Sequence, residues 1–236
     1  MKFKTDLHVH TAEASFCAKH TATEVADRYI AEGYSGLVIT NHYSPYTVDH
    51  MGDAWSIDAF LLPYRRMREH AGDRLHVLLG AELRFEGDNN DYLIYGLTED
   101  FLYRYPDLHL LSLKKFVPLA HEHGLLVIQA HPFRDGMILR DPKLLDGVEV
   151  FNASPPQSRN HFALDWAKHY ELIPTSGSDL HTKDHPIGGG ILTDTPMETV
   201  EQLVEILRAR TATLICEGPG AERDRMHTMA ATLDEA

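Results

Sequence analysis

The stretch that decides the fold is Asp6-Leu7-His8-Val9-His10-Thr11, which closes a short alternating run that begins at Phe3. Residues two apart on an extended strand point to the same side, so Asp6, His8 and His10 share one face of the predicted strand. Two imidazoles with a nearby carboxylate suit Zn, Mn or Fe better than Mg or Ca, which prefer oxygen ligands. A metal site at the end of this strand is the first hypothesis, and an edge strand with solvated histidines is the alternative.

The composition is that of one ordinary globular domain. The 236 residues are 43% hydrophobic and 24% charged, and no linker rich in Pro, Gly or Ser divides them. We therefore expect a single domain over residues 1–236, with a peripheral tail after about residue 218. The sequence shows neither a signal peptide nor the run of about 18 apolar residues that spans a membrane, so we expect a cytoplasmic protein with no membrane partner. The oligomeric state stays open.

Charge and residue usage narrow the class of partner. The formal net charge of −13 would repel a phosphate backbone, so extended nucleic acid is not an expected partner. Cys17 and Cys216 are the only cysteines and lie far apart, which predicts neither a disulfide framework nor a thiolate zinc site, and we expect Cys17 to be an inert small residue. The 16 histidines exceed what packing requires, and histidine is the commonest metal ligand.

Apolar runs alternate with stretches of helical spacing along the chain. Such runs are typical of strands buried on both faces of a parallel sheet. The predicted strands cover residues 36–40, 75–81, 92–96, 125–130, 147–151, 172–175 and 212–215, and the predicted helices cover residues 23–33, 57–70, 111–123, 160–169 and 197–209. This alternation implies parallel strands joined by right-handed crossovers. The three glycines at 188–190 match no phosphate-loop signature and predict a tight turn.

Polar residues follow the last apolar residue of most of these strands. They are Asn41, His42, Glu82, His131, Asn152, Asp179 and His181. In a closed α/β barrel the carboxyl ends of all strands meet at one rim, whereas an open doubly wound sheet gathers residues mainly at one crevice. Contributions from so many strands favour the barrel. We therefore expect an α/β fold, a distorted (β/α)7 barrel of the TIM-barrel type, with the site at its C-terminal rim.

Five motifs in order resemble the polymerase and histidinol phosphatase (PHP) family. Besides the first motif they are Ile39-Thr40-Asn41-His42, Gly80-Ala81-Glu82, Ala130-His131-Pro132 and Gly177-Ser178-Asp179-Leu180-His181. The resemblance implies a distorted seven-stranded barrel that holds two or three divalent transition metals and hydrolyses phosphate esters. It also implies three ligand sets: His8, His10, Glu82 and Asp179 for one metal, Glu82 as a bridge with His131 for a second, and His42 with His181 for a third.

The chain departs from the family pattern in several places. Asn41 stands where the family commonly has an aspartate, and the aspartate that often follows the first motif has no counterpart near Phe16. The third metal site therefore depends on whether His20 fills it. Histidinol phosphatases tend to carry a histidine after the strand at 92–96, and here Leu97-Thr98 follows, so histidinol phosphate is not the expected substrate.

The expected activity is that of a metal-dependent phosphoesterase acting on a small metabolite or nucleotide. A metal-bridged hydroxide would attack the phosphate ester, with Glu82 and Asp179 at the centre and Zn, Mn or Fe as the metals. A metal-bound water, His185 or Asp91 would protonate the leaving group.

Two arginines are candidates for binding the substrate, and two other functions are alternatives to a phosphoesterase. Arg84 and Arg134 lie two or three residues past a ligand, so each would present a guanidinium fork to phosphate oxygens, and a solvated surface arginine is the alternative. The alternative functions are an exonuclease acting on oligonucleotide ends and a non-catalytic metal-binding module.

Overall fold

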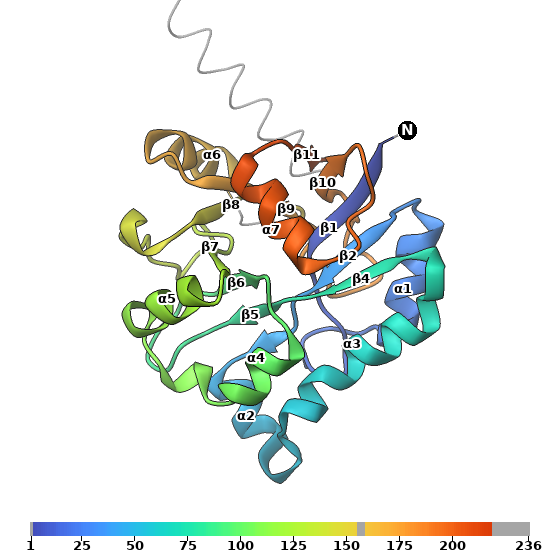
Figure 1. Cartoon of the computed structure of the whole chain (residues 1–236), viewed down its shortest axis with the longest axis horizontal. Coiled ribbons are helices and arrows are strands. Elements are labelled where there is room, and N and C mark those ends of the chain that lie inside the picture. The colour runs from blue at the N-terminus through green and yellow to red at the C-terminus, as the bar shows by residue number, and fades with distance from the viewer. Residues whose placement is uncertain (1, 155–158, 219–236) are drawn as a thin grey trace, which may run out of the picture.

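The computed structural model describes residues 2–154 and 159–218, which form a mixed α/β fold (Figure 1). The predicted tail after residue 218 lies outside the described residues. The α-helices are α1 (Ala22–Ala31), α2 (Pro45–Met51), α3 (Ile57–Ala71), α4 (Glu99–Arg104), α5 (Leu113–Glu122), α6 (Asn160–His169) and α7 (Val200–Ala209). Within the described ranges, no helix combines the length and apolar character needed to cross a membrane.

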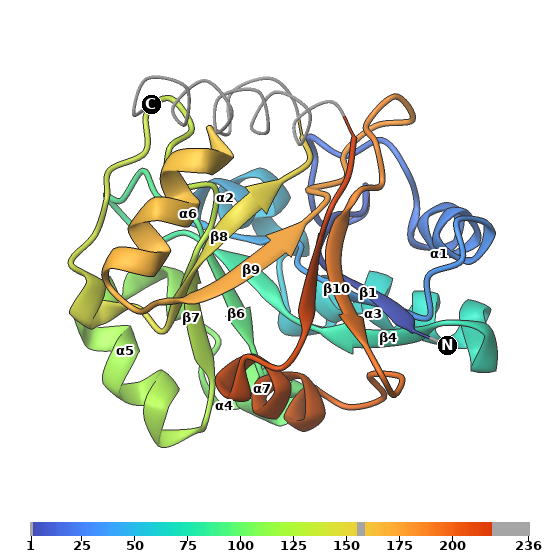
Figure 2. The ribbon, with the colours of Figure 1, turned by 90° about the horizontal axis from the view of Figure 1, so that it is seen from above.

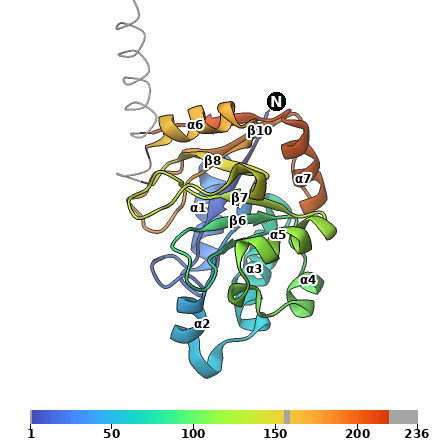
Figure 3. The ribbon, with the colours of Figure 1, turned by 90° about the vertical axis from the view of Figure 1, so that its left-hand side faces the viewer.

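The strands form two sheets rather than one. The first has the order β11-β10-β1-β2-β4 and the second has the order β3-β5-β6-β7-β8-β9. The strands are β1 (Phe3–Val9), β2 (Gly36–Ile39), β3 (His42–Tyr43), β4 (His76–Leu79), β5 (Ala81–Leu83), β6 (Tyr92–Tyr95), β7 (Leu126–Gln129), β8 (Gly147–Asn152), β9 (Ile173–Gly177), β10 (Gly189–Thr193) and β11 (Thr213–Cys216). Figure 2 shows α6 and α1 on opposite flanks of these strands, and Figure 3 shows α2 at the opposite end of the molecule from α6.

Two neighbouring segments of the chain each run from the first sheet into the second. β2 is followed almost at once by β3, and β4 by β5, and the hydrogen bonds between the two segments continue across the break. The N–H of Gly80 donates to the C=O of Ile39 at 3.0 Å, and the N–H of Glu82 donates to the C=O of Asn41 at 3.1 Å. The carboxyl ends of these segments therefore lie side by side, which brings residues 41–42 next to Glu82.

The end of β9 meets β1 on the other side of the molecule. The N–H of Asp179 donates to the C=O of His8 at 2.8 Å, and Val9 pairs with Leu180 in an isolated parallel bridge. The two sheets therefore adjoin on both sides. The α/β prediction is confirmed, but a closed (β/α)7 barrel is not, because the strand ladders fall into two sheets.

The prediction of parallel strands throughout was wrong in part. β5, β6 and β7 pair antiparallel, and β10 pairs antiparallel with both β1 and β11. The pairs β1–β2, β2–β4, β3–β5, β7–β8 and β8–β9 are parallel, as expected. The link between β5 and β6, residues 84–91, contains no helix. Because a parallel pair needs a long crossover, so short a link returns the chain in the opposite direction.

Of the predicted turn at residues 188–190, Gly189 and Gly190 are instead the first two residues of strand β10. A Cβ on Gly189 would lie 2.1 Å from the carbonyl carbon of Gly177, and one on Gly190 would lie 2.3 Å from the carbonyl oxygen of Thr5. The glycines therefore let β10 approach the backbones of β9 and β1 directly. The turn prediction was wrong because a tight turn and a close backbone approach both require glycine.

Alternate residues of the central strands face two different hydrophobic cores. In β4, Val77 packs into the core that also holds residues of α1, α3, α5 and α6, whereas Leu78 packs into a second core. The second core takes Leu7 from the first sheet and Leu93 from the second, so it lies between the sheets, and α7 covers it with Leu203. Burial on both faces explains the continuous apolar runs of the sequence.

We expect Gly189→Ala to lower the free energy of unfolding by about 3 kcal/mol, because the new methyl group would collide with the backbone of Gly177. Gly136→Ala is the control, since its Cβ would meet nothing within 4 Å and only its positive φ of +88° is strained, at about 1 kcal/mol. Urea denaturation of the parent and both variants measures the two losses. Equal losses would contradict the close approach at Gly189.

Candidate metal centre

The polar residues predicted at the strand ends converge on one buried site. His8 lies in β1, Glu82 lies in β5 and Asp179 lies two residues after β9, and each of these residues is 1% exposed or less. His131 follows β7 and is equally buried. The site therefore lies at the carboxyl ends of strands from both sheets, where the sequence predicts it.

The first group of side chains has the spacing of ligands around a single ion. His8 Nε2 lies 3.5 Å from Glu82 Oε1 and 3.4 Å from Asp179 Oδ1. His10 Nε2 lies 3.3 Å from Glu82 Oε2 and 3.3 Å from Asp179 Oδ1. Ligands at about 2.1 Å from a tetrahedral ion lie about 3.4 Å apart. These four residues therefore fit a transition-metal ion.

The second group shares Glu82 with the first. His131 Nε2 lies 2.9 Å from Glu82 Oε1 and 3.9 Å from Asp91 Oδ2, and the three residues offer donor atoms within 4.8 Å of one another. Glu82 therefore stands where a carboxylate that bridges two ions would stand. Asp91, predicted only as a proton donor, is also a candidate ligand here.

The third group contains His10, His42 and His181, again within 4.8 Å of one another. The ring of His10 lies 4.5 Å from that of His42 and 4.4 Å from that of His181, measured between centroids. Among the described residues, His20 belongs to none of the groups that could hold a metal. Cys17, predicted to be inert, lies here instead, with Sγ 3.3 Å from His42 Nε2.

Burial and mutual charge set the protonation of this cluster. Burial alone would raise the pKa of Glu82, but the charges of His42 and His8 hold that pKa well below its usual value. Burial, helped by the charges of His181 and His42, lowers the pKa of His10 to about 4. An ionised carboxylate and a neutral imidazole are the forms that bind metal.

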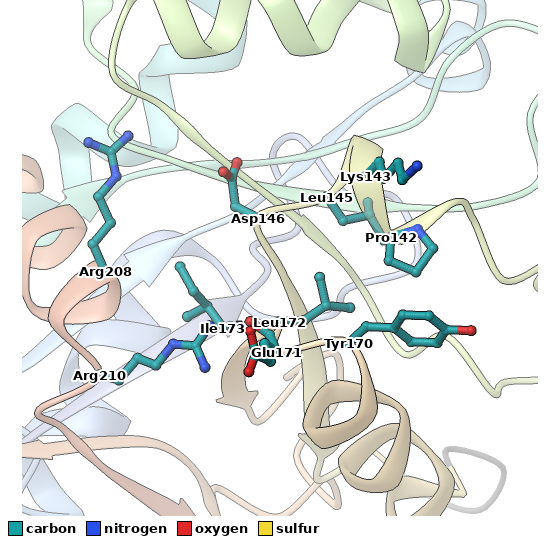
Figure 4. A pocket seen from close by; sticks show the side chains of 10 residues that line it. All are labelled: Pro142, Lys143, Leu145, Asp146, Tyr170, Glu171, Leu172, Ile173, Arg208 and Arg210. Carbon is teal, nitrogen blue, oxygen red and sulfur yellow. Dashed lines mark hydrogen bonds between the residues drawn. The ribbon is translucent and has the colours of Figure 1, made fainter.

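A small cavity opens beside the cluster. Its volume is about 270 Å³, and it is lined by Phe16, Cys17, His42, Ser44, Tyr46, Thr47, Arg84 and Asp91. A second cavity of about 490 Å³ lies away from the cluster, near the starts of β8 and β9 (Figure 4). Its two arginines already have partners, because Arg208 and Arg210 donate to the backbone oxygens of Gly124 and Glu171. We therefore take the smaller cavity as the candidate substrate site.

Solved structures share this fold at low sequence identity. A two-domain protein from Bacteroides vulgatus that contains a predicted PHP-like metal-dependent phosphoesterase has a TM-score of 0.70 at 16% identity, over 92% of this chain and 65% of that one. This chain has the PHP-like fold. PsfC from Pseudomonas syringae has a TM-score of 0.66 at 14% identity, over 98% of this chain and 99% of that one.

A third similar structure carries an anion. It is an amidohydrolase from Chromobacterium violaceum, solved with bound sulfate and no metal, and its TM-score is 0.53 at 17% identity, over 86% of this chain and 96% of that one. No protein-family model and no curated protein matches the chain. The PHP resemblance predicted from the five motifs is therefore confirmed at the level of the fold.

Glu149 supports the candidate site from beneath, and sequence reasoning missed it. Its Oε1 lies 2.9 Å from His8 Nδ1, and its Oε2 accepts hydrogen bonds from the N–H of His131 and from Asn152 Nδ2, each at 2.9 Å. A carboxylate on the far nitrogen of a ligand histidine fixes the tautomer and the ring. The signal in the sequence was a charged residue in the middle of the apolar run at 147–151.

Asp6 shares β1 with His8 and lies shortly before His10, but it does not join any of the candidate ligand groups in the described chain. Its carboxylate accepts hydrogen bonds from the hydroxyl of Tyr29 at 2.8 Å and from the backbone N–H of Ser178 at 3.0 Å. Burial raises the pKa of Asp6 to about 6, against the opposing effect of these hydrogen bonds. Asp6 therefore ties β1 to α1 and to the end of β9.

Asn41 also holds backbone rather than belonging to a ligand group. Its Oδ1 accepts hydrogen bonds from the N–H of Thr11 at 2.8 Å and from the hydroxyl of Ser15 at 3.0 Å. An asparagine can therefore replace the family's usual aspartate here without removing a ligand from the three groups.

Both predicted substrate-binding arginines already contact candidate ligands. Arg84 donates through Nε and Nη2 to the two carboxylate oxygens of Asp91, each at 2.7 Å. Arg134 donates through Nη2 to Asp179 Oδ2 at 2.5 Å. Their side chains are 41% and 28% exposed, so each also faces solvent at the site.

His185, predicted as a catalytic residue, borders the third group. Its Nδ1 accepts a hydrogen bond from the backbone N–H of His181 at 3.3 Å, and its carbonyl oxygen accepts one from Arg28 Nη2 at 2.6 Å. The ring centroids of His185 and His181 lie 6.1 Å apart. One ring nitrogen of His185 is therefore used in shaping the loop that carries His181.

Two residues of the candidate centre have unusual backbone angles. His131 has a φ of +27° and Asp179 has a φ of +50°. Non-glycine residues rarely adopt positive φ, and such strain persists where the surrounding structure fixes the residue, often at functional sites. The hydrogen bonds that His131 and Asp179 donate to Glu149 and to the C=O of His8 supply that support.

We expect Glu149→Gln to weaken metal binding by about 10- to 100-fold, because the amide no longer fixes the ring of His8 as an anion does. Competition titration with a chromogenic chelator measures the affinity. Glu122→Gln on α5 makes the same chemical change outside the groups that could hold a metal and should leave the affinity unchanged. A parental affinity in Glu149→Gln would mean that Glu149 does not support the centre.

Proposed function

We propose that this protein is a metal-dependent phosphoesterase that hydrolyses a phosphate ester of a small metabolite or nucleotide. The observation that carries the proposal is the environment of Glu82. Four imidazoles surround its buried carboxylate, with nitrogen to oxygen distances of 3.5 Å for His8, 3.3 Å for His10, 2.8 Å for His42 and 2.9 Å for His131. So many metal-binding groups around one carboxylate support a centre with more than one ion.

The donor set favours Zn, Mn or Fe over Mg or Ca, because it mixes imidazoles with carboxylates. His8, His10, Glu82 and Asp179 would hold one ion. Glu82 and His131, with Asp91 nearby, would hold a second. Bound divalent ions supply Lewis acidity and lower the pKa of a bound water.

The two arginines would place the phosphate. Arg84 and Arg134 bring positive charge to the edge of a cluster built on carboxylates, and each has solvent on one side. A guanidinium can hold a carboxylate and a phosphate oxygen at once through different N–H groups. The sulfate of the Chromobacterium violaceum protein has the shape and charge of a phosphate group, which supports an anionic substrate for this fold.

The size of the cavity supports a small substrate. At about 270 Å³ it falls just below the usual range for ligand sites, which starts at roughly 300 Å³. The net charge of −13 opposes binding of an extended nucleic acid, so an exonuclease has less support. A non-catalytic metal-binding module would need neither the arginines nor the cavity. The cytoplasmic location stays a prediction.

We expect the purified protein to bind two or more transition-metal ions per chain and, when loaded with manganese, to hydrolyse aryl phosphate or members of a mononucleotide panel. Glu82→Gln keeps the shape of the side chain but removes the negative charge that the first and second groups of candidate ligands share. Turnover should therefore fall by at least about 100-fold, and one ion should be lost. Elemental analysis and initial rates measure both. Glu86→Gln, the same change at an exposed position, is the control.

The outcomes separate the candidate functions. If the parent protein binds fewer than one metal ion per chain, the proposed metal centre is wrong. If it is fully loaded but hydrolyses no phosphate ester, a non-catalytic metal-binding module is favoured. Activity of Glu82→Gln within about tenfold of the parent would mean that Glu82 is not the shared ligand.

We expect Arg134→Ala to reduce kcat/KM for phosphomonoesters by roughly 10- to 150-fold, the effect of losing a charge-assisted contact of about 1.5 to 3 kcal/mol. Arg134→Lys should recover only part, because an ammonium cannot reproduce the guanidinium fork. Metal content is measured on the same samples, since Arg134 also contacts Asp179. If the variant loses metal as well as activity, the role of Arg134 is to hold Asp179 and not to bind the phosphate. Arg68→Ala, on the exposed face of α3, should change neither value.

A further inference from the structure

A sulfur atom lies at coordination distance from one histidine of the third group. Cys17 Sγ lies 3.3 Å from His42 Nε2, and the thiol also interacts with His181. A thiolate at about 2.3 Å and an imidazole nitrogen at about 2.05 Å from one tetrahedral ion lie about 3.6 Å apart. The observed spacing is therefore close to that of two ligands on a shared ion.

The loop that carries Cys17 is fixed to the segments that carry the histidines. Before Cys17, the hydroxyl of Ser15 accepts a hydrogen bond from the backbone N–H of His42 at 3.0 Å. After it, the N–H of Lys19 donates to the C=O of His181 at 2.8 Å. Because the loop is tied on both sides of residue 17, the backbone holds the thiol between the two imidazoles.

The carboxylate of Glu82 lies on the other side of the His42 ring. Glu82 Oε2 is buried and accepts no well-formed hydrogen bond, although His42 Nδ1 lies 2.8 Å away and His10 Nε2 lies 3.3 Å away. Glu82 thus faces one nitrogen of the His42 ring while Cys17 faces the other. A carboxylate on one side of an imidazole and a metal on the other is the usual arrangement of a metal-binding histidine.

We propose that Cys17 supplies a thiolate ligand to the third divalent ion that the PHP resemblance implies at His42 and His181, with His10 adjacent. A thiolate is a soft ligand, so this position would select zinc over manganese or magnesium, unlike the first two positions with their nitrogen and oxygen donors. The inference goes beyond the proposed function, which requires only the two ions around Glu82. Each can therefore fail while the other stands.

Cobalt substitution tests the sulfur ligand directly. The full chain loaded with Co²⁺ should show sulfur-to-cobalt charge-transfer absorption in the near ultraviolet. Cys17→Ser should remove this absorption and one equivalent of cobalt, whereas Cys216→Ser, which removes the only other cysteine, should keep both. Because Cys17 is exposed, its replacement should leave the folded core intact, which circular dichroism checks. A cobalt-loaded parent without the absorption, or Cys17→Ser with it, would overturn the proposal.

Metal selectivity gives a second readout. Cys17→Asp keeps an anionic ligand but replaces a soft donor with a hard one, so the zinc-to-manganese affinity ratio of the third ion should fall by at least about tenfold. Competition titration with both metals measures the ratio, and an unchanged ratio would contradict a thiolate ligand. Phosphoesterase activity is assayed on the same samples. A parent that shows the charge-transfer absorption but hydrolyses no phosphate ester would refute the proposed function and leave the sulfur site in place.

Discussion

The buried negative charge of Glu82 is the constraint on which the rest of the site depends. A carboxylate that is 1% exposed is costly unless cations or hydrogen-bond donors surround it. Here the compensating groups are imidazoles that come from different parts of the chain: His8 from β1, His42 from β3 and His131 from the end of β7. Only a fold that brings several strand ends to one place can deliver them together, so the α/β arrangement and the chemistry of the site require each other.

A layer of polar residues beneath the candidate ligands holds the strand ends that carry them in fixed positions. Glu149 fixes the ring of His8 and the backbone of His131, and Asp6 holds the end of β9 through Ser178. Asn41 fixes the loop after β1 through Thr11. None of the three belongs to a candidate ligand group in the described chain, yet each holds the ring of a candidate ligand or the backbone beside one. Their partners are hydrogen-bonding groups of the backbone or of buried side chains, which is how a packed interior accommodates polar atoms at low cost.

The sequence predicted most of the candidate site because its residues stand at the ends of apolar runs, where both their type and their place are informative. His8, His10, His42, Glu82, His131, Asp179 and His181 all lie in the groups that the structure brings together. The proximity of Cys17 to His42 could not be predicted, because a single cysteine carries no spacing signal and the contact arises from a loop that only the folded chain closes. His20 has a residue type that fits a metal, but among the described residues it lies in none of the groups that could hold one. The sheet arrangement was harder to predict, because strand direction depends on how links such as residues 84–91 are built and apolar runs do not encode it.

The pairing of β1 has a consequence for how the chain folds. Phe3 pairs with Thr193 and Thr5 with Ile191, so one neighbour of the first strand is contributed by residues almost two hundred positions later. Contacts of such long sequence separation must overcome a large loop-closure entropy and are made slowly. During synthesis, His8 and His10 cannot reach their final positions until residue 193 has left the ribosome. The two candidate ligands near the start of the chain therefore lack their final neighbours for most of the time that the protein is being made.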